Sequence, residues 1–292
     1  MHKLKRLTAF DVVITALMLL LSLIFIYPLW TIFVAAFSEP LEYVKNPLAL
    51  FPAHITLYNF RKLITSATVW NGYKNTLIYV SLGTLINVTL TFVTAYAIAM
   101  KELPYRRLIS FLITLTLFFS GGLIPTYIVV KNYGMLNTVW AMVLPGAIAT
   151  YNLMITRTYL SQQIPADLTE AAEVDGAGAF RTFIQIVTPL SKPILAVITL
   201  FYASGHWNAW TDAMIYLGRS VEMYPLQLIL RSMLINEETM GLVATEGGSI
   251  VSLYTITLNY AVMVIAILPL LIVFPFVQKF FVKGVMIGAI KG

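Results

Sequence analysis

The segment at positions 165–193, PADLTEAAEVDGAGAFRTFIQIVTPLSKP, concentrates charge in a chain that is otherwise strongly apolar. Four carboxylates fall within nine residues: Asp167, Glu170, Glu173 and Asp175. Carboxylates on a short, ordered segment can meet a complementary surface and fix its register. The chemistry that this pattern offers is therefore recognition of a partner.

Residues that impose order punctuate the same segment. Pro165 suits the first turn of a helix, where Asp167 and Glu170 would lie near the positive end of the helix dipole. Gly176 can adopt the left-handed conformation that ends such a helix. A small apolar stripe at i, i+3 and i+4 spacing accompanies these signals: Leu168, Ala171 and Ala172.

A second short helix is expected after Gly176. Its apolar residues recur at helical spacing: Phe180, Phe183, Ile184 and Val187. Pro189 and Pro193 close the unit and return the chain to an apolar segment. The pattern predicts two short helices at an angle, the first presenting alanines and carboxylates and the second held by its phenylalanines. Because a slim helix can enter a cleft, the loop at about 161–192 is interpreted as a docking loop.

Elsewhere in the chain, ionisable residues are scarce. His206 and Asp212, within GHWNAWTDA, are the two that fall in apolar segments. An ion-coupled carrier usually needs buried carboxylates or unwound half-helices, so their scarcity argues against one. Ser204 and His206 lie two residues apart, on different faces of a helix, and make a poor catalytic pair.

Enzyme and nucleotide motifs are also missing from the sequence. There is no H-E-x-x-H pair, no G-x-S-x-G turn and no G-x-x-x-x-G-K-[ST] phosphate loop. We therefore expect no catalytic residue, no metal site and no cofactor bound by this chain. The absence of cysteine leaves the redox compartment undetermined.

Two further groups of residues have both a structural and a functional interpretation. Small and polar residues recur every fourth position in the second apolar segment: Gly83, Asn87, Thr91, Ala95 and Ala99. Such a ridge is typical of close helix packing, whereas Asn87 and Thr91 could instead border a solute pathway. In the fifth segment, Trp207, Asn208, Trp210 and Asp212 fit either an interfacial aromatic belt or a sugar contact. The i, i+4 pair Asn208 and Asp212 slightly favours the contact.

The composition is that of an integral membrane protein. Of 292 residues, 59% are hydrophobic and 11% are charged. The net charge of +6 does not indicate nucleic-acid binding, because no Lys/Arg tract carries interleaved aromatic residues. Six apolar segments are each long enough to cross a bilayer, at about 12–37, 73–99, 108–130, 138–158, 193–216 and 257–280. The expected fold is an all-α, six-span bundle forming a single transmembrane domain over 1–292.

Breaks and flanking charges refine this topology. Ser120-Gly121-Gly122 and Pro125 interrupt the third segment, and Pro145-Gly146 the fourth. The first segment resembles a signal peptide but is too long and lacks a cleavage site, so we expect it to remain as a span. If the N-terminus is cytoplasmic, 12 of the 19 Lys and Arg residues lie inside. The positive-inside rule then places both termini and the docking loop in the cytoplasm, with long outer loops at about 38–72 and 217–256.

At EAAEVDGAGAFRTFIQIVTPLSKP the sequence resembles the EAA loop of bacterial ABC importer permeases, most closely those of the carbohydrate-uptake class. The likeness to the maltose-type second permease subunit extends over nearly the whole chain. It includes LIPTYIVVKNYGMLNTVWAMVLP, WNAWTDA, MYPLQLILRSML and QKFFVKGVMIGAIKG. The nearest subgroup serves oligosaccharides derived from polysaccharides, including acidic ones such as alginate and pectin fragments.

The resemblance implies a helix that couples the spans to an ATPase. The residues matching that helix and its loop are Glu170, Ala171, Ala172, Asp175, Gly176, Ala177 and Arg181. The C-terminal Gly288, Lys291 and Gly292 match a tail that reaches the ATPase interface. The implied partners are a second, homologous permease, two ATP-binding subunits that bind ATP and Mg, an extracellular or periplasmic solute-binding protein and an oligosaccharide.

The sequence thus predicts a non-catalytic, multi-pass subunit of an ATP-driven oligosaccharide importer in the bacterial cytoplasmic membrane. The alternative is a stand-alone secondary carrier or channel, which would need an ion-binding carboxylate in the bundle and no docking loop. An intramembrane enzyme would need a nucleophile and a base facing each other, and the sequence offers no such pair.

Overall fold

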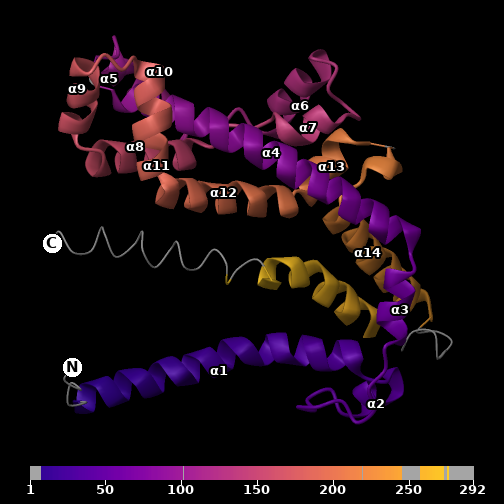
Figure 1. Cartoon of the computed structure of the whole chain (residues 1–292). Coiled ribbons are helices and arrows are strands. Elements are labelled where there is room, and N and C mark those ends of the chain that lie inside the picture. Colours follow the sequence, from indigo (N-terminus) through magenta and orange to yellow (C-terminus); the bar gives the residue numbers. More distant parts are fainter. Residues whose placement is uncertain (1–7, 101, 219, 245–256, 273–274, 276–292) are drawn as a thin grey trace. The chain divides into compact units, whose positions relative to one another are not determined.

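The computed structural model describes residues 8–100, 102–218, 220–244, 257–272 and 275 (Figure 1). Over these residues the chain is helical, and the extended pairing is one isolated antiparallel bridge between Ser38 and Ile55. The described residues fall into two compact units. The first contains those up to Ser66 and from Leu230 to Leu268, and the second those from Ala67 to Ile229 and from Pro269 onward.

The first unit is dominated by the long helix α1. Its helices are α1 (Ala9–Phe37), α2 (Pro40–Lys45), α3 (Tyr58–Ile64) and most of a helix at Thr257–Ile272. A reciprocal cap starts α1: the Thr8 N–H donates to Asp11 Oδ2 at 2.9 Å, and the Asp11 N–H donates to Thr8 Oγ1 at 3.3 Å. The 29 residues of α1 span about 43 Å, more than the hydrocarbon thickness of a bilayer.

Hydrogen bonds fix the short helices of this unit. The Asn59 amide donates to Thr257 Oγ1 at 2.9 Å in a buried position, and the hydroxyls of Tyr43 and Tyr260 lie 3.1 Å apart. The expected loop at 38–72 thus contains α2, α3 and the start of α4. Its α2 and α3 are bound to the helix that begins at Thr257.

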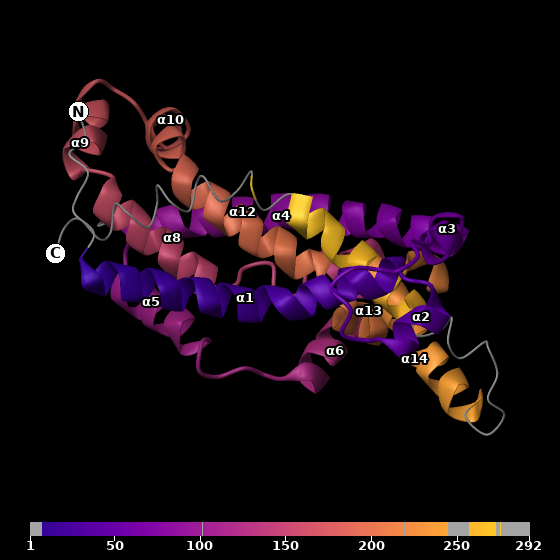
Figure 2. The ribbon, with the colours of Figure 1, turned by 90° about the horizontal axis from the view of Figure 1, so that it is seen from below.

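The second unit is built around α4. Its helices are α4 (Ala67–Ala99), α5 (Arg106–Leu115), α6 (Leu123–Asn132), α7 (Val139–Val143), α8 (Thr150–Gln163), α9 (Ala166–Val174), α10 (Ala179–Thr182), α11 (Thr188–Leu190), α12 (Lys192–Trp207) and α13 (Trp210–Tyr216); α14 (Leu226–Ala244) begins in it. Figures 1 and 2 show α12 beside α4, with α9 and α10 at one end of α4 and α13 toward the other. A hydrophobic cluster lies in each half of α4, one including Tyr79 and the other including Phe92 and Ile98.

Three of the expected spans are interrupted helices. The range 108–130 is α5 and α6, because Gly122 takes a left-handed φ of 80°. Pro125 lies in the first turn of α6, where its missing N–H costs no hydrogen bond. The range 138–158 is α7 and α8, separated at Pro145-Gly146, and α8 continues to Gln163. The range 193–216 is α12 and α13, which meet at Asn208 and Ala209.

The segment before α14 packs on the first half of α4. The hydroxyl of Tyr79 donates to the Met223 carbonyl at 2.7 Å, and the Leu226 N–H donates to Thr76 Oγ1 at 2.8 Å. Gly72 allows this approach, because a Cβ there would lie 3.1 Å from the Leu226 Cα. Part of the predicted outer loop at 217–256 is thus packed on the helix.

Two described helices, α1 and α4, are long and apolar enough to cross a membrane. A third candidate is the bent pair Ala179–Leu190 and Lys192–Trp207, whose axes differ by 80°. The remaining described apolar helices are shorter. The all-helical prediction is confirmed for the described residues, and the last expected span at 257–280 is described to Ile272 and at Pro275.

Candidate functional site

The predicted docking loop begins with α9, which ends in a compact left-handed cap. Gly176 has φ +77°, and its N–H donates to the Glu173 carbonyl at 3.0 Å. The Ala177 N–H donates to the Ala172 carbonyl at 2.8 Å. These two bonds make the Schellman motif, which satisfies carbonyls that a helix end would otherwise leave unpaired. Backbone geometry thus stops α9 where the sequence predicted it to stop.

The surface of α9 is mostly exposed. Glu170, Ala171 and Asp175 are exposed, whereas Ala172 is buried against the unit. The stripe predicted from Leu168, Ala171 and Ala172 is therefore divided between two faces. Val174, which the stripe did not include, is 89% exposed. The helix accordingly offers small apolar surface and carboxylates together.

The second half of the loop turns the chain into α12. After α10 comes a π-helical turn at Phe183–Val187, and α11 follows. Phe183 and Val187 pack against the end of α4, with the rings of Phe183 and Phe92 5.0 Å apart. Phe180 is 80% exposed and Ile184 is also exposed. The prediction that phenylalanines hold the second helix therefore applies to Phe183 but is wrong for Phe180, because no described side chain covers the Phe180 ring.

A cavity of about 440 Å³ lies behind α9. Its lining comes from α4, the start of α5, α8 and the loop, and includes Tyr96, Glu102, Arg106, Glu170, Glu173 and Thr182. Arg181 lies outside this lining, exposed, and its Nε donates to Gln185 Oε1 at 3.0 Å. The inner side of α9 thus borders a cavity.

The α4 ridge faces α12 and forms a polar ladder with it. The Asn87 amide nitrogen lies 3.0 Å from His206 Nε2, and Thr91 Oγ1 lies 2.6 Å from the Tyr202 hydroxyl. Both Asn87 and Thr91 are buried. A Cβ at Gly83 would lie 2.3 Å from His206 Nε2. These contacts fit the interpretation of the ridge as close helix packing, and the pathway interpretation of Asn87 and Thr91 stays a prediction.

Sequence reasoning missed Tyr202. Its hydroxyl contacts Thr91 and also accepts the Ala149 N–H at 3.0 Å, so it connects α4, α12 and the start of α8. A signal was present, because Tyr202 and His206 have the same i, i+4 spacing as Asn87 and Thr91. Two matching polar pairs in separate spans indicate a shared interface.

The residues of the fifth span do not form one group. Trp207 is buried and packs near Tyr73, with ring centroids 6.3 Å apart, whereas Trp210 packs on a cluster that includes Tyr79. Asn208 and Asp212 are exposed. The interpretation of these two as an i, i+4 pair is wrong, because α12 ends at Trp207 and α13 begins at Trp210.

The remaining predicted site residues are Gly288, Lys291 and Gly292, which lie outside the described residues. Over the described part of the chain, no three His, Asp or Glu side chains come together as a metal site. The geometry that the site offers is therefore a capped, exposed helix at one end of a bundle.

Comparisons with known proteins cover the full length of the chain. It is 35% identical to a polygalacturonan/rhamnogalacturonan transport system permease protein of Bacillus subtilis (strain 168), over 97% of this chain and 98% of that protein. A trehalose/maltose transport system permease protein of Thermococcus litoralis is 29% identical over 94% of each chain. The sequence matches no protein-family model.

One solved structure is also similar to this chain. It is a crystal structure of a bacterial ABC transporter involved in the import of the acidic polysaccharide alginate. It matches with a TM-score of 0.81 and 30% sequence identity, covering 93% of this chain and 96% of that chain.

These likenesses decide between the functional alternatives. They favour an ATP-driven importer over a stand-alone carrier or channel, and in such importers ATP hydrolysis occurs in separate subunits. The chain is thus a multi-pass protein of the cytoplasmic membrane that works with partner subunits. It belongs to the carbohydrate-uptake family of ABC importer permease subunits.

Proposed function

We propose that this subunit forms half of an oligosaccharide pathway with six spans and both termini in the cytoplasm. The charge distribution supports this orientation. The ladder between α4 and α12 supports the order of the spans, because Asn87 pairs with His206 and Thr91 with Tyr202, so residue numbers rise along one helix as they fall along the other. The second and fifth spans of a six-span chain run in opposite directions, as this antiparallel register requires.

The α9 helix, in this proposal, is the part that docks on the ATPase. The carrying observation is the Schellman-capped helix with exposed carboxylates in a permease of this family. Glu170, Ala171 and Asp175 would contact the ATPase, and Ala172, Gly176, Ala177 and Arg181 would set the helix's shape and position. Phe183 and Val187, packed on the end of α4, would pass movement of α9 to the spans.

The assembly that we propose contains a second, related permease, two ATP-binding subunits and a solute-binding protein. ATP and Mg would be bound by the ATP-binding subunits, and no cofactor by this chain. Gly288, Lys291 and Gly292 would reach the ATPase interface. The long outer segments would meet the solute-binding protein.

The substrate that we propose is an oligosaccharide rich in uronic acids. The support is that two of the proteins compared above are named for acidic polysaccharides, polygalacturonan and alginate. Addition of oligogalacturonides, with the solute-binding protein, should stimulate the importer's ATPase more strongly than addition of neutral maltodextrins. Equal stimulation by both would contradict the acidic assignment. Asn87, Thr91, Trp207, Asn208, Trp210 and Asp212 stay candidates for the pathway, and unchanged stimulation after Trp207→Ala or Asp212→Ala would remove those two.

The docking proposal is tested by co-purification from membranes in a mild detergent. Gly176→Pro removes the N–H that bonds Glu173 and cannot adopt φ +77°, so the cap should fail and the ATPase should be lost. Gly178→Ala is the matched control, because Gly178 has φ −67° and open space at its Cβ. Full ATPase recovery and normal transport with Gly176→Pro would contradict the proposal.

A further inference from the structure

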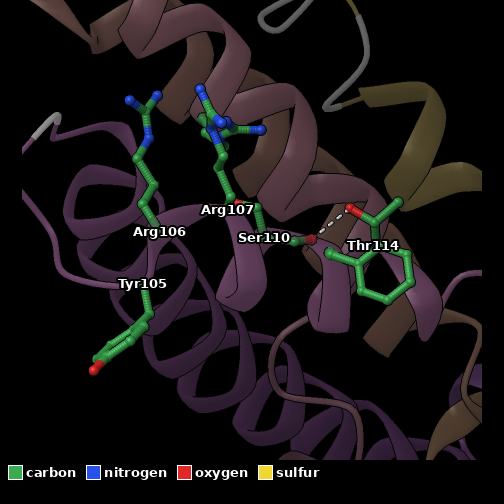
Figure 3. A pocket seen from close by; sticks show the side chains of 7 residues that line it. Tyr105, Arg106, Arg107, Ser110 and Thr114 are labelled. Atoms are coloured by element: carbon green, nitrogen blue, oxygen red, sulfur yellow. Dashed lines mark hydrogen bonds between the residues drawn. The ribbon is translucent and has the colours of Figure 1, made fainter.

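A second cavity, of about 860 Å³, opens at the start of α5 (Figure 3). It is lined by Tyr105, Arg106, Arg107, Ser110, Phe111, Thr114 and Arg157. Three of these are arginines and none is acidic. In Figure 3 the Arg106 and Arg107 side chains extend toward the same side, whereas the Tyr105 ring extends to the other. The cavity therefore concentrates positive charge contributed by α5 and α8.

These arginines lack carboxylate partners in the part of the chain that the structure describes. None of the three has a carboxylate oxygen within 4.0 Å there. Arg106 Nε donates to the Ile98 carbonyl at 2.9 Å, which binds the start of α5 to the end of α4. Arg157 Nε and Ser110 Oγ are buried atoms without a hydrogen-bond partner among the described residues. Buried polar atoms are normally paired, so two unpaired ones lining one cavity point to a ligand.

The helix end makes the charge imbalance larger. Tyr105, at the N-cap of α5, has φ +55° and makes no side-chain cap. Arg106 and Arg107 lie in the first turn, beside the positive end of the helix dipole, and no acidic residue lies there. Like charges at this position are unfavourable. A bound anion would neutralise the arginines and accept hydrogen bonds from the helix end.

The cavity also has an apolar side. This side favours an anion that carries hydrocarbon over a free inorganic anion. Phe111 lies one helical turn after Arg107, lines the same cavity and is exposed. Leu108 and Leu112, on the same helix, are exposed as well. Thr114 Oγ1 contacts Met154 Sδ at 3.9 Å, which holds α5 against α8. A ligand here would meet guanidinium groups at one end and hydrocarbon along α5.

We propose that this cavity binds the phosphate of an anionic phospholipid, with its acyl chains along α5. Basic pockets between spans on the cytoplasmic side suit such headgroups. The inference rests on the cytoplasmic orientation proposed above. Arg106 lines both this cavity and the one behind α9, so the lipid would lie next to the loop proposed to couple transport to ATP.

Native mass spectrometry of the delipidated importer, titrated with phosphatidylglycerol, tests the site. Arg107→Gln combined with Arg157→Gln should weaken the tightest phosphatidylglycerol binding by about tenfold or more. Arg61→Gln combined with Lys62→Gln, which removes two exposed charges from α3, should leave it unchanged. Arg106 is retained, because its bond to Ile98 supports the fold.

Two further titrations, with inorganic phosphate and with phosphatidylcholine, identify the ligand. Millimolar inorganic phosphate should not displace the lipid, and phosphatidylcholine should bind at least tenfold more weakly, by the same order-of-magnitude reasoning. Complete displacement by phosphate would show a free-anion site and overturn the lipid assignment, as would equal binding of phosphatidylcholine or of the double variant.

If the double variant does not assemble, Arg107→Lys replaces it. This change keeps the charge but loses the guanidinium fork, so weakened binding supports the site and unchanged binding overturns it. Because this readout does not involve ATP, it fails or succeeds independently of the docking proposal.

Discussion

The α9 loop and the α4 ridge use similar residues at similar spacing but differ in what covers them. In the ridge, Thr91 and Ala95 are fully buried against other helices of the same chain. In the loop, Ala171 is exposed and Val174 is 89% exposed. Small residues that let helices approach closely are therefore satisfied internally in α4. In α9 no other described part of the chain covers Ala171 or Val174, and the docking proposal assigns this surface to the ATPase.

The two regions also differ in what maintains their shape. Side-chain pairs between α4 and α12 stabilise the ridge. Two backbone bonds at Gly176 and Ala177 stabilise α9. A change in the ridge should therefore reduce stability, whereas a change in the loop should reduce partner binding.

The largest effect on stability is expected from Gly83→Leu. A Cβ at Gly83 would lie 2.3 Å from His206 Nε2, so a leucine there must displace the His206 ring from Asn87 or separate α4 from α12, with a destabilisation of about 3 kcal/mol. The melting temperature of the purified subunit complex should fall. Ser81→Leu, at an exposed position of α4, is the control and should leave it unchanged. An unchanged melting temperature for Gly83→Leu would contradict this prediction, because it would show that close packing of α4 and α12 at this position does not stabilise the protein.

The next largest loss of stability is expected from substitution of Gly176. Its size, and the amount of ATPase retained, should depend on which side chain is introduced. Val disfavours φ +77° and should destabilise the cap locally by about 1–2 kcal/mol, with loss of the ATPase on purification. Asn adopts left-handed φ more readily and should retain much of the ATPase. If both variants bind the ATPase equally, the left-handed cap does not determine docking.

Removing one rung of the ladder should have a smaller effect. Thr91→Val loses the contact to Tyr202 while keeping shape, and the average value of such bonds in membranes is about 0.6 kcal/mol. Tyr202→Phe should cost more, because it also leaves the Ala149 N–H without its acceptor. A double-mutant cycle on unfolding free energies measures the shared part, and a coupling energy of zero would show that the contact adds no stability.

The smallest effect on stability is expected from Phe180→Ser. Phe180 is 80% exposed, so the melting temperature should stay at the wild-type value while ATPase retention decreases. Phe183→Ser, at the neighbouring packed ring, should instead lower the melting temperature. A fall in the melting temperature with Phe180→Ser would place that side chain in the core and weaken the contrast between loop and ridge.

Local signals predicted much of this molecule. The stop at Gly176, the breaks at Gly122 and Gly146 and the helical nature of the chain follow from residue types, because glycine permits left-handed φ and long apolar runs favour helices in a membrane. The EAA-like loop motif predicted the family that the full-length relatives show.

Burial could not be predicted in the same way. The spacing of Phe180, Phe183, Ile184 and Val187 is helical, but Phe183 and Val187 pack on α4 whereas Phe180 and Ile184 are exposed, and a π-helical turn at Phe183–Val187 interrupts the regular period. A break of two residues between α12 and α13 similarly separates Asn208 from Asp212. A small departure from regular helix geometry thus changes which side chains share a face.

The sequence by itself therefore determined that the chain is an apolar helical protein, where its helices are interrupted, and which loop carries the family's motif. Only the tertiary structure decided that Thr91 meets Tyr202, that Val174 stays uncovered and that Arg157 joins Arg106 and Arg107 around one cavity. The physical reason is distance along the chain. Periodicity reports which residues share a face of one helix, whereas burial, pairing and charge clustering depend on helices that packing brings together.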